Sequence, residues 1–204
     1  MSAQVDAQVC IKYKKGRNTN GYKLDELVPP KGDMVLGTQS PWGSQMLVLG
    51  IDPGQAGGIS AVKFLNGKTP TLLKAMRTPV LFFKKKKVID VASIMIELQD
   101  LAIDIAIIEQ VHAMPKQGVS SSFQFGRSYG AAEACCQLLA PKVEYVSPAV
   151  WKKAMGLGSE KQSSLDMAKL TFGRNELWNV KANDGIAEAA LLCIYLVDKF
   201  NKVD

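Results

Sequence analysis

The chain has 204 residues, 47% of them hydrophobic, and a formal net charge of +6 at pH 7, which suits one ordinary domain with a well-filled core. No apolar run approaches the roughly 20 residues that span a bilayer, and the amino terminus lacks the charged-then-apolar pattern of a signal peptide. These features exclude a membrane protein and predict a soluble, cytoplasmic one. The positive charge favours acidic partners such as nucleic acid. The four cysteines lack paired metal-ligand spacing, so we expect reduced core residues at Cys10, Cys135, Cys136 and Cys193.

Residues 1–45 differ in composition from the rest of the chain. They combine a small excess of basic residues with many Gly, Pro and Ser residues and show no sustained periodicity. This composition predicts a weakly structured extension or leader, and a nucleic-acid-binding arm and a linker are the alternatives. Residues 46–204 are expected to form the folded domain.

The segment Met46–Ser60, MLVLGIDPGQAGGIS, organises the chain that follows. It begins with an almost unbroken apolar run, which is typical of a central strand covered on both faces. The strand ends at Asp52, and the glycines of PGQAGG then predict a turn with room for a large anionic ligand. A hairpin with a solvated aspartate is the alternative.

Two more strands and a helix are expected next. Strands at Ile59–Leu65 and Thr71–Arg77, joined by an Asn-Gly-Lys turn, complete a three-strand meander. Apolar residues at helical spacing predict a helix over Val88–Leu101. We expect the lysine run Lys84–Lys87 to lie in a solvated loop, with contact to a DNA backbone as the alternative.

A second apolar strand, Ile103–Glu109, also ends on an acid. A carboxylate that follows Ile107 and Ile108 is costly to bury unpaired. Glu109 must therefore reach solvent, pair with a cation or help to bind a metal, and the parallel with Asp52 favours a functional role.

A long helix is expected to begin near Ser120–Ser122, which can cap its free amides, and to end near Leu139. Phe123 on this helix is a candidate core residue. Arg127 is expected to be its exposed positive charge.

A short strand, Val143–Val146, and a short helix opened by Pro148 follow. Basic and aromatic residues are neighbours on this helix, at Trp151, Lys152 and Lys153. The next helix is expected from Ser159 to about Phe172. It places Lys161 in its first turn, where the helix dipole disfavours a cation, so either an anion lies nearby or the lysine is simply exposed.

The last helix opens near Asn183 and carries Asp184 and Glu188 on one face. Like charges at a spacing of four destabilise a helix slightly, so the pair favours a counter-ion. Magnesium or manganese suits hard carboxylate oxygens, whereas one histidine and no cysteine cluster make a poor zinc site.

Several motifs in this order resemble one family. GIDPG ends the first strand, an isoleucine-rich strand ends in Glu109, and EQVHAMPKQGVSSSFQFGRSYG precedes a proline-tryptophan-lysine segment and DGIAEAALL. Over about Met46–Leu196 the chain resembles RuvC-type Holliday-junction resolvases of the phage and bacterial RuvC-like group. The resemblance implies an α/β, ribonuclease H-like fold with a mixed five-stranded sheet flanked by helices. It also implies a homodimer that acts as a magnesium-dependent crossover junction endodeoxyribonuclease.

The resemblance also implies roles for single residues. Lys161 matches the family's basic residue near the scissile phosphate. The last acid departs from the commoner pattern of two aspartates separated by three, because Ala187 stands at that position and Glu188 follows it. Two Mg²⁺ ions about 4 Å apart, or Mn²⁺ in their place, are expected, and the products would carry 5′-phosphates. The matching catalytic and metal-binding acids are Asp52, Glu109, Asp184 and Glu188.

Branched DNA, four-way junctions above all, is the expected partner. His112 falls where the family often places an aromatic wedge, and an imidazole stacks on a base less extensively than a phenyl ring. The remaining expected DNA-binding residues are Arg127, Lys152, Lys153 and Lys161.

Two other classes of function are considered. A strand followed by Asp and glycines is also a phosphate-binding turn of actin and sugar-kinase folds, but the chain has no room for their duplicated fold. A non-catalytic junction-binding module is the other alternative, and the complete set of carboxylates argues against it.

Overall fold

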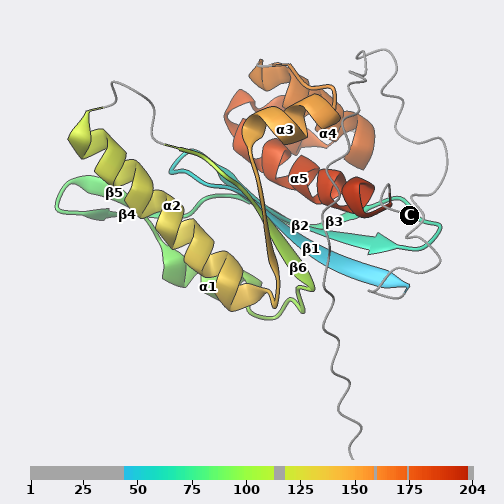
Figure 1. Cartoon of the computed structure of the whole chain (residues 1–204), viewed down its shortest axis with the longest axis horizontal. Helices are drawn as coiled ribbons and strands as arrows, with labels where there is room; N and C mark the ends of the chain where they lie inside the picture. The colour runs from blue at the N-terminus through green and yellow to red at the C-terminus, as the bar shows by residue number, and fades with distance from the viewer. Residues whose placement is uncertain (1–43, 113–117, 159, 174, 202–204) are drawn as a thin grey trace, which may run out of the picture.

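A computed structural model describes residues 44–112, 118–158, 160–173 and 175–201 (Figure 1). The extension predicted for residues 1–45 lies, as far as residue 43, outside this described part. A five-stranded sheet forms the centre, in the order β3-β2-β1-β6-β7. Its strands are β1 (Gln45–Asp52), β2 (Gly58–Leu65), β3 (Thr71–Arg77), β6 (Ile105–Glu109) and β7 (Val143–Val146).

The sheet is mixed, as predicted. β1, β2 and β3 form an antiparallel meander, whereas β6 runs parallel to β1, and β7 runs parallel to β6. Ile51 of β1 is aligned with Ile108 of β6. The residues that follow them, Asp52 and Glu109, therefore leave the sheet side by side at the same edge.

Helices cover both faces of the sheet (Figure 1). One face carries α1 (Val91–Leu98) and α2 (Val119–Leu139). The other carries α3 (Pro148–Ala154), α4 (Lys161–Phe172) and α5 (Asp184–Asn201), with short 3₁₀ turns η1 (Glu176–Asn179) and η2 (Lys181–Asn183) before α5. In the described residues, no helix is long and apolar enough to cross a membrane.

Each face of the sheet has its own apolar core, which is why β1 lacks an alternating polar side. Met46 and Val48 of β1 face the α5 side, whereas Leu49 and Ile51 face α1 and α2. The cysteines within the described residues, Cys135, Cys136 and Cys193, are buried and free, as expected for reduced core residues. Cys10 lies outside the described residues.

Close packing of α5 on β1 depends on Gly50. A Cβ at this position would lie 2.0 Å from the carbonyl oxygen of Ala189 and 2.8 Å from Sγ of Cys193. We expect Gly50→Ala to lower the free energy of unfolding by at least about 3 kcal/mol, because the helix must move off the strand. Gly130→Ala on α2, where a Cβ meets nothing within 4 Å, is the control. It should raise stability by up to about 1 kcal/mol in a urea titration.

The helix predicted over Val88–Leu101 was wrong at its start. A hairpin, β4 (Val80–Phe83) and β5 (Lys86–Ile89), precedes a shorter helix, and the lysine run forms the hairpin turn and part of β5 instead of a loop. Asp90 fixes the boundary, because its carboxylate accepts hydrogen bonds from the backbone N–H and the hydroxyl of Ser93 at 3.1 and 2.7 Å.

The start of α2 also differs from the prediction. Gly118 is the N-cap and offers no side-chain hydrogen bond, while Ser120–Ser122 lie within the first turn. Phe123, a candidate core residue, is 73% exposed because its side of the helix faces solvent. Helix α4 begins at Lys161, and the predicted start at Ser159 lies outside the described residues.

Candidate metal centre

Three carboxylates meet at the edge of the sheet where β1 and β6 end. Asp52, Glu109 and Glu188 each offer an oxygen, and these oxygens lie within 4.8 Å of one another. The first two come from adjacent parallel strands, and the third comes from the second turn of α5. Glu109 is buried, and the other two side chains are partly buried.

Small residues allow Asp52 to lie against α5. A Cβ at Gly185 would come within 2.8 Å of Oδ2 of Asp52, so only glycine leaves room for the carboxylate beside the first turn of the helix. Just before the helix, Arg77 Nε donates a hydrogen bond of 2.8 Å to Oδ1 of Asn183. This bond ties the end of β3 to the start of α5 and fixes the helix over the strand ends.

Two glycines of the turn after Asp52 are required by the backbone that packs around them. A Cβ at Gly57 would lie 2.1 Å from the carbonyl oxygen of Asp52, and one at Gly58 would lie 2.3 Å from the backbone nitrogen of Ile186. These glycines make room for the protein's own backbone. Gly54 has no comparably close neighbour, so the turn is open there.

The grouped acids repel one another and are poorly hydrated. Burial, together with the charges of Glu109 and Glu188, raises the pKa of Asp52 to about 8. Burial also raises the pKa of Glu109. A cluster that binds protons this readily is stabilised by a cation, and hard carboxylate oxygens at this spacing suit a divalent ion such as Mg²⁺ or Mn²⁺.

Two lysines already face these acids. Lys152 Nζ lies 2.7 Å from Oε1 of Glu188, which also accepts a hydrogen bond of 3.1 Å from the hydroxyl of Ser164. Lys161 Nζ lies 2.5 Å from Oδ2 of Asp184. The anion expected near Lys161 is therefore Asp184, whose hydrogen bond raises the pKa of the lysine.

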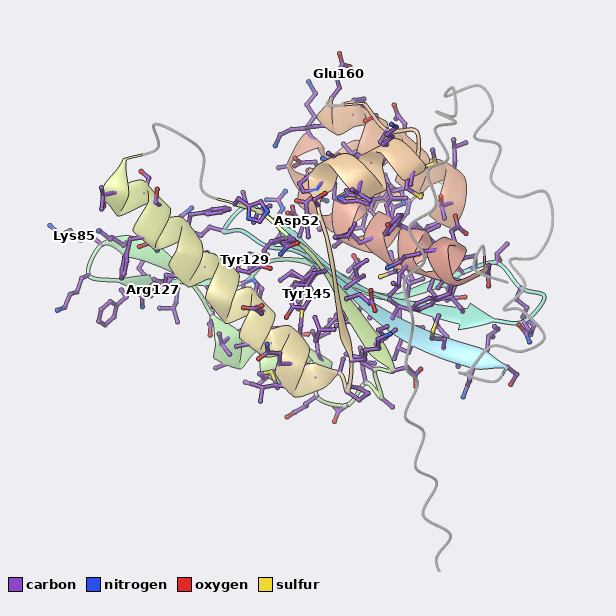
Figure 2. All side chains as sticks on the ribbon, in the orientation of Figure 1. Asp52, Lys85, Arg127, Tyr129, Tyr145 and Glu160 are labelled. Carbon is purple, nitrogen blue, oxygen red and sulfur yellow. The ribbon has the colours of Figure 1, made fainter. Side chains whose placement is uncertain are left out.

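The structure thus brings three of the four predicted acids into one cluster and places Asp184 beside it, paired with Lys161. Lys152 lies within the acidic site, whereas Lys153 is exposed on α3. His112 is exposed just after β6. Arg127 lies on α2, away from Asp52, where its guanidinium is 5.8 Å from the ring centre of Phe83 (Figure 2).

Trp151 is a site residue whose role the sequence analysis missed. Its side chain is fully buried, and its Nε1–H donates a hydrogen bond of 2.7 Å to Oε1 of Glu109. The bond fixes the orientation of the carboxylate. A tryptophan after Pro148 offers no sequence signal for this contact, because the contact depends on α3 packing under the end of β6.

We expect Trp151→Phe to lower the affinity for Mn²⁺ about tenfold, because partners that orient a ligand are typically worth that much. Calorimetric titration of the metal-free protein with Mn²⁺ measures this loss. Trp178→Phe is the matched control, since Trp178 is also buried but its Nε1 has no hydrogen-bond partner in the described residues. Equal affinities in the two variants would contradict the orienting role.

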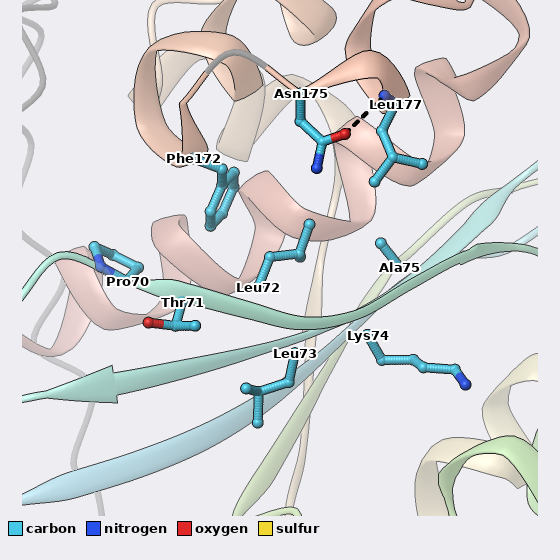
Figure 3. Close-up of a pocket in the computed structure, with 9 residues that line it drawn as sticks. All are labelled: Pro70, Thr71, Leu72, Leu73, Lys74, Ala75, Phe172, Asn175 and Leu177. Carbon is cyan, nitrogen blue, oxygen red and sulfur yellow. Dashed lines mark hydrogen bonds between the residues drawn. The ribbon is translucent and has the colours of Figure 1, made fainter.

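Two cavities lie beside the sheet, and neither is lined by one of the four predicted acids. A cavity of about 410 Å³ lies between β3 and the segment after α4, lined by Leu72, Ala75 and Phe172 among others, and contains no acid (Figure 3). A groove of similar volume borders the glycine turn at Gly54 and Gln55 and runs between β5 and α2.

Comparison with solved structures finds the same fold. The structure of Thermus thermophilus RuvC has a TM-score of 0.54 at 19% identity, covering 76% of this chain and 97% of that one. RuvC of T. thermophilus in complex with a Holliday junction substrate has a TM-score of 0.52 at 16% identity, covering 76% and 96%. No protein-family model and no curated protein sequence matches. The chain therefore has the ribonuclease H-like fold of RuvC, as predicted.

Proposed function

We propose that this chain is a metal-dependent endonuclease that cuts four-way or other branched DNA and leaves 5′-phosphates. The cluster of Asp52, Glu109 and Glu188 at the ends of β1 and β6 carries the proposal. It stands in a fold shared with RuvC, one of whose structures holds a Holliday junction. A module that binds junctions without cutting them would have no need for a group of acids in which burial and mutual repulsion raise the pKa of Asp52 to about 8.

The carboxylates would hold Mg²⁺ or Mn²⁺, with Asp184 completing a set of four that serves two ions. When bound, such ions activate water and stabilise the leaving oxygen of a phosphodiester. The protein's own part is positional. β1 and β6 hold Asp52 and Glu109 side by side, Trp151 orients Glu109, and Ser164 orients Glu188.

The lysines would supply positive charge to the scissile phosphate. The side chain of Lys161 is 77% exposed and pairs with Asp184 at the edge of the site, so its amino group can turn toward a phosphate at the rim. Lys152 is less exposed, at 25%, and stays against Glu188. Charge placed where the transition state is most negative is the main contribution a protein makes to phosphoryl transfer.

Two chains would act together on one junction. In its described residues one chain carries one cluster of acids, and paired cuts on two strands need two such clusters. A homodimer meets this requirement. The exposed side chains of His112, Lys153 and Arg127 would contact the DNA beyond the cut.

A mobile four-way junction with labelled strands tests the proposal. The full chain with Mg²⁺ should give paired, symmetric nicks with ligatable 5′-phosphate ends, and a chelator should abolish them. A linear duplex of the same sequence is the control and should be cut far less. Binding of the junction without any cutting in Mg²⁺ or Mn²⁺ would support the silent module instead.

A further inference from the structure

The β4–β5 hairpin exposes apolar and basic side chains together. Phe82 is 71% exposed and Phe83 is 52% exposed, and Phe123 of α2 is 73% exposed. Lys84 lies 5.6 Å from the ring centre of Phe83, and Arg127 lies 5.8 Å from it. Figure 2 shows Lys85 at the end of the hairpin, projecting from the body of the protein. Phe123 and Arg127 are one turn apart on α2, so Phe123 lies on the side of the helix that approaches Phe83, whereas Phe82, the preceding residue of β4, projects from the opposite face of the hairpin. Folded proteins rarely expose large apolar side chains together without a partner for them.

The turn of this hairpin is strained. Lys84 and Lys85 have φ angles of 46° and 65°, the left-handed region that a two-residue hairpin turn requires. Asn-Gly fits such a turn, whereas lysine resists it because of its Cβ. Backbone strain of this kind is retained mainly where the side chains serve a function. Two lysines at the tip keep positive charge where the fold would favour uncharged residues.

The charge of this surface has one sign. Over residues 80–89 and 119–132, the cations are Lys84, Lys85, Lys86, Lys87 and Arg127, and there is no acid. An isologous contact with a second copy would bring these cations close to the same cations of the other copy, and like charges repel. A polyanion complements them, and flat rings beside cations are typical of surfaces that bind unpaired nucleotides.

Hydrogen bonds join the hairpin to the turn that follows Asp52. The carbonyl oxygen of Lys87 accepts hydrogen bonds of 2.9 Å from Nε2 of Gln55, in the glycine turn after Asp52, and of 2.9 Å from Nε2 of Gln124 on α2. The groove of about 410 Å³ runs between these elements, lined by Gly54, Lys86 and Ser128. A nucleic-acid strand that lies across the hairpin can therefore continue toward the carboxylates.

The geometry points to the hairpin surface, defined by Phe83, Lys84, Lys85, Phe123 and Arg127, as a second binding site, for single-stranded DNA. The phenylalanines stack on unpaired bases, and the cations contact the phosphates. The inference rests on the proposed function in one respect, namely that a branched DNA substrate would offer unpaired bases beside its branch point. Binding to a single strand is a property of the surface itself.

Fluorescence anisotropy of a labelled single-stranded oligonucleotide and of its duplex, with full-length protein in chelator, tests this site. Phe83→Ala/Phe123→Ala should weaken single-strand binding at least about tenfold and duplex binding much less, since only unpaired bases stack. Lys84→Asn/Lys85→Gly should lower the salt dependence of single-strand binding by about 0.7 per lysine. Its melting temperature should equal or exceed that of the wild type, because the turn is relieved, so weaker binding cannot be ascribed to misfolding.

The matched controls alter exposed residues that lie away from the hairpin surface. Leu138→Ala alters an exposed apolar residue at the other end of α2, and Lys68→Ala alters an exposed lysine in the turn after β2, and neither should change binding. Unchanged binding in both hairpin variants would overturn the proposal, as would equal loss for duplex and single strand. A dimer that becomes a monomer in the hairpin variants, with binding retained, would identify a contact between copies instead. Binding is measured in chelator, where no cleavage takes place, so failure of the nuclease proposal leaves this result unaffected.

Discussion

Replacement of Asp52 by asparagine is expected to reduce junction cleavage by about three orders of magnitude or more. The amide has the shape of the carboxylate but lacks its charge, so the cluster with Glu109 and Glu188 loses the affinity of a hard anionic ligand. Rates on the labelled junction in Mg²⁺ measure the loss. Junction binding in chelator should be preserved, and cleavage at the wild-type rate would exclude Asp52 from the reaction.

The same substitution is expected to stabilise the metal-free fold. The pKa of Asp52 rises from 3.8 to about 8 on folding, so between these values the folded protein binds the proton more tightly than the unfolded chain does. Stability from this group therefore falls as pH rises from about 4 to about 8. An asparagine side chain does not titrate, so Asp52→Asn should gain about 1–3 kcal/mol near the upper end of this window and little at its lower end.

Urea titrations in chelator at both ends of that pH window measure this gain. Asp166→Asn is the control, because Asp166 is exposed on α4 and lies outside the cluster of acids. It should show no pH-dependent gain. A variant at Asp52 that is less stable than the wild type near pH 8 would show that the carboxylate is well solvated or paired in the metal-free protein.

Hydrophobic patterning predicted the sheet well because its central strands are buried on both faces. The apolar run before Asp52 and the one before Glu109 could belong only to interior strands, and both became neighbours in the mixed sheet. The strands Thr71–Arg77 and Val143–Val146 were predicted with their observed bounds. Parallel pairing of β1 with β6 then brings the two acids together, without any information beyond the strand ends.

The hairpin and its surroundings could not be predicted in the same way. Val88 and Ile89 fit the apolar spacing of the following helix, yet they are buried in β5. The turn at Lys84 and Lys85 lacks the Asn or Gly that marks a two-residue hairpin, so no local signal reveals it. The exposure of Phe123 likewise depends on which side of α2 the sheet covers.

Contacts between elements that are distant along the chain could not be predicted from the sequence either. Trp151 meets Glu109 only because α3 packs beneath the end of β6, and Gly185 faces Asp52 only because α5 crosses the strand there. Spacing placed Asp184 and Glu188 on one face of a helix. Asp184 pairs with Lys161, whereas Glu188 belongs to the cluster. The two acids differ in this way because Asp184 is the first residue of α5 and Glu188 lies one turn deeper.

Because Glu188 and Asp184 have different partners, Glu188→Gln is the most informative substitution after Asp52→Asn. Glu188 lies in the cluster and is fixed there by Lys152 and Ser164, so loss of its charge should weaken Mn²⁺ binding and slow cleavage about a hundredfold or more. Asp184→Asn breaks the pair with Lys161 and should weaken Mn²⁺ binding less, because Asp184 lies outside the cluster. Calorimetry of both metal-free variants with Mn²⁺ compares the two acids directly. Equal losses would mean that Lys161 releases Asp184 to the metal, whereas a larger loss at Asp184 would contradict the assignment of Glu188 as the ligand that replaces the commoner aspartate.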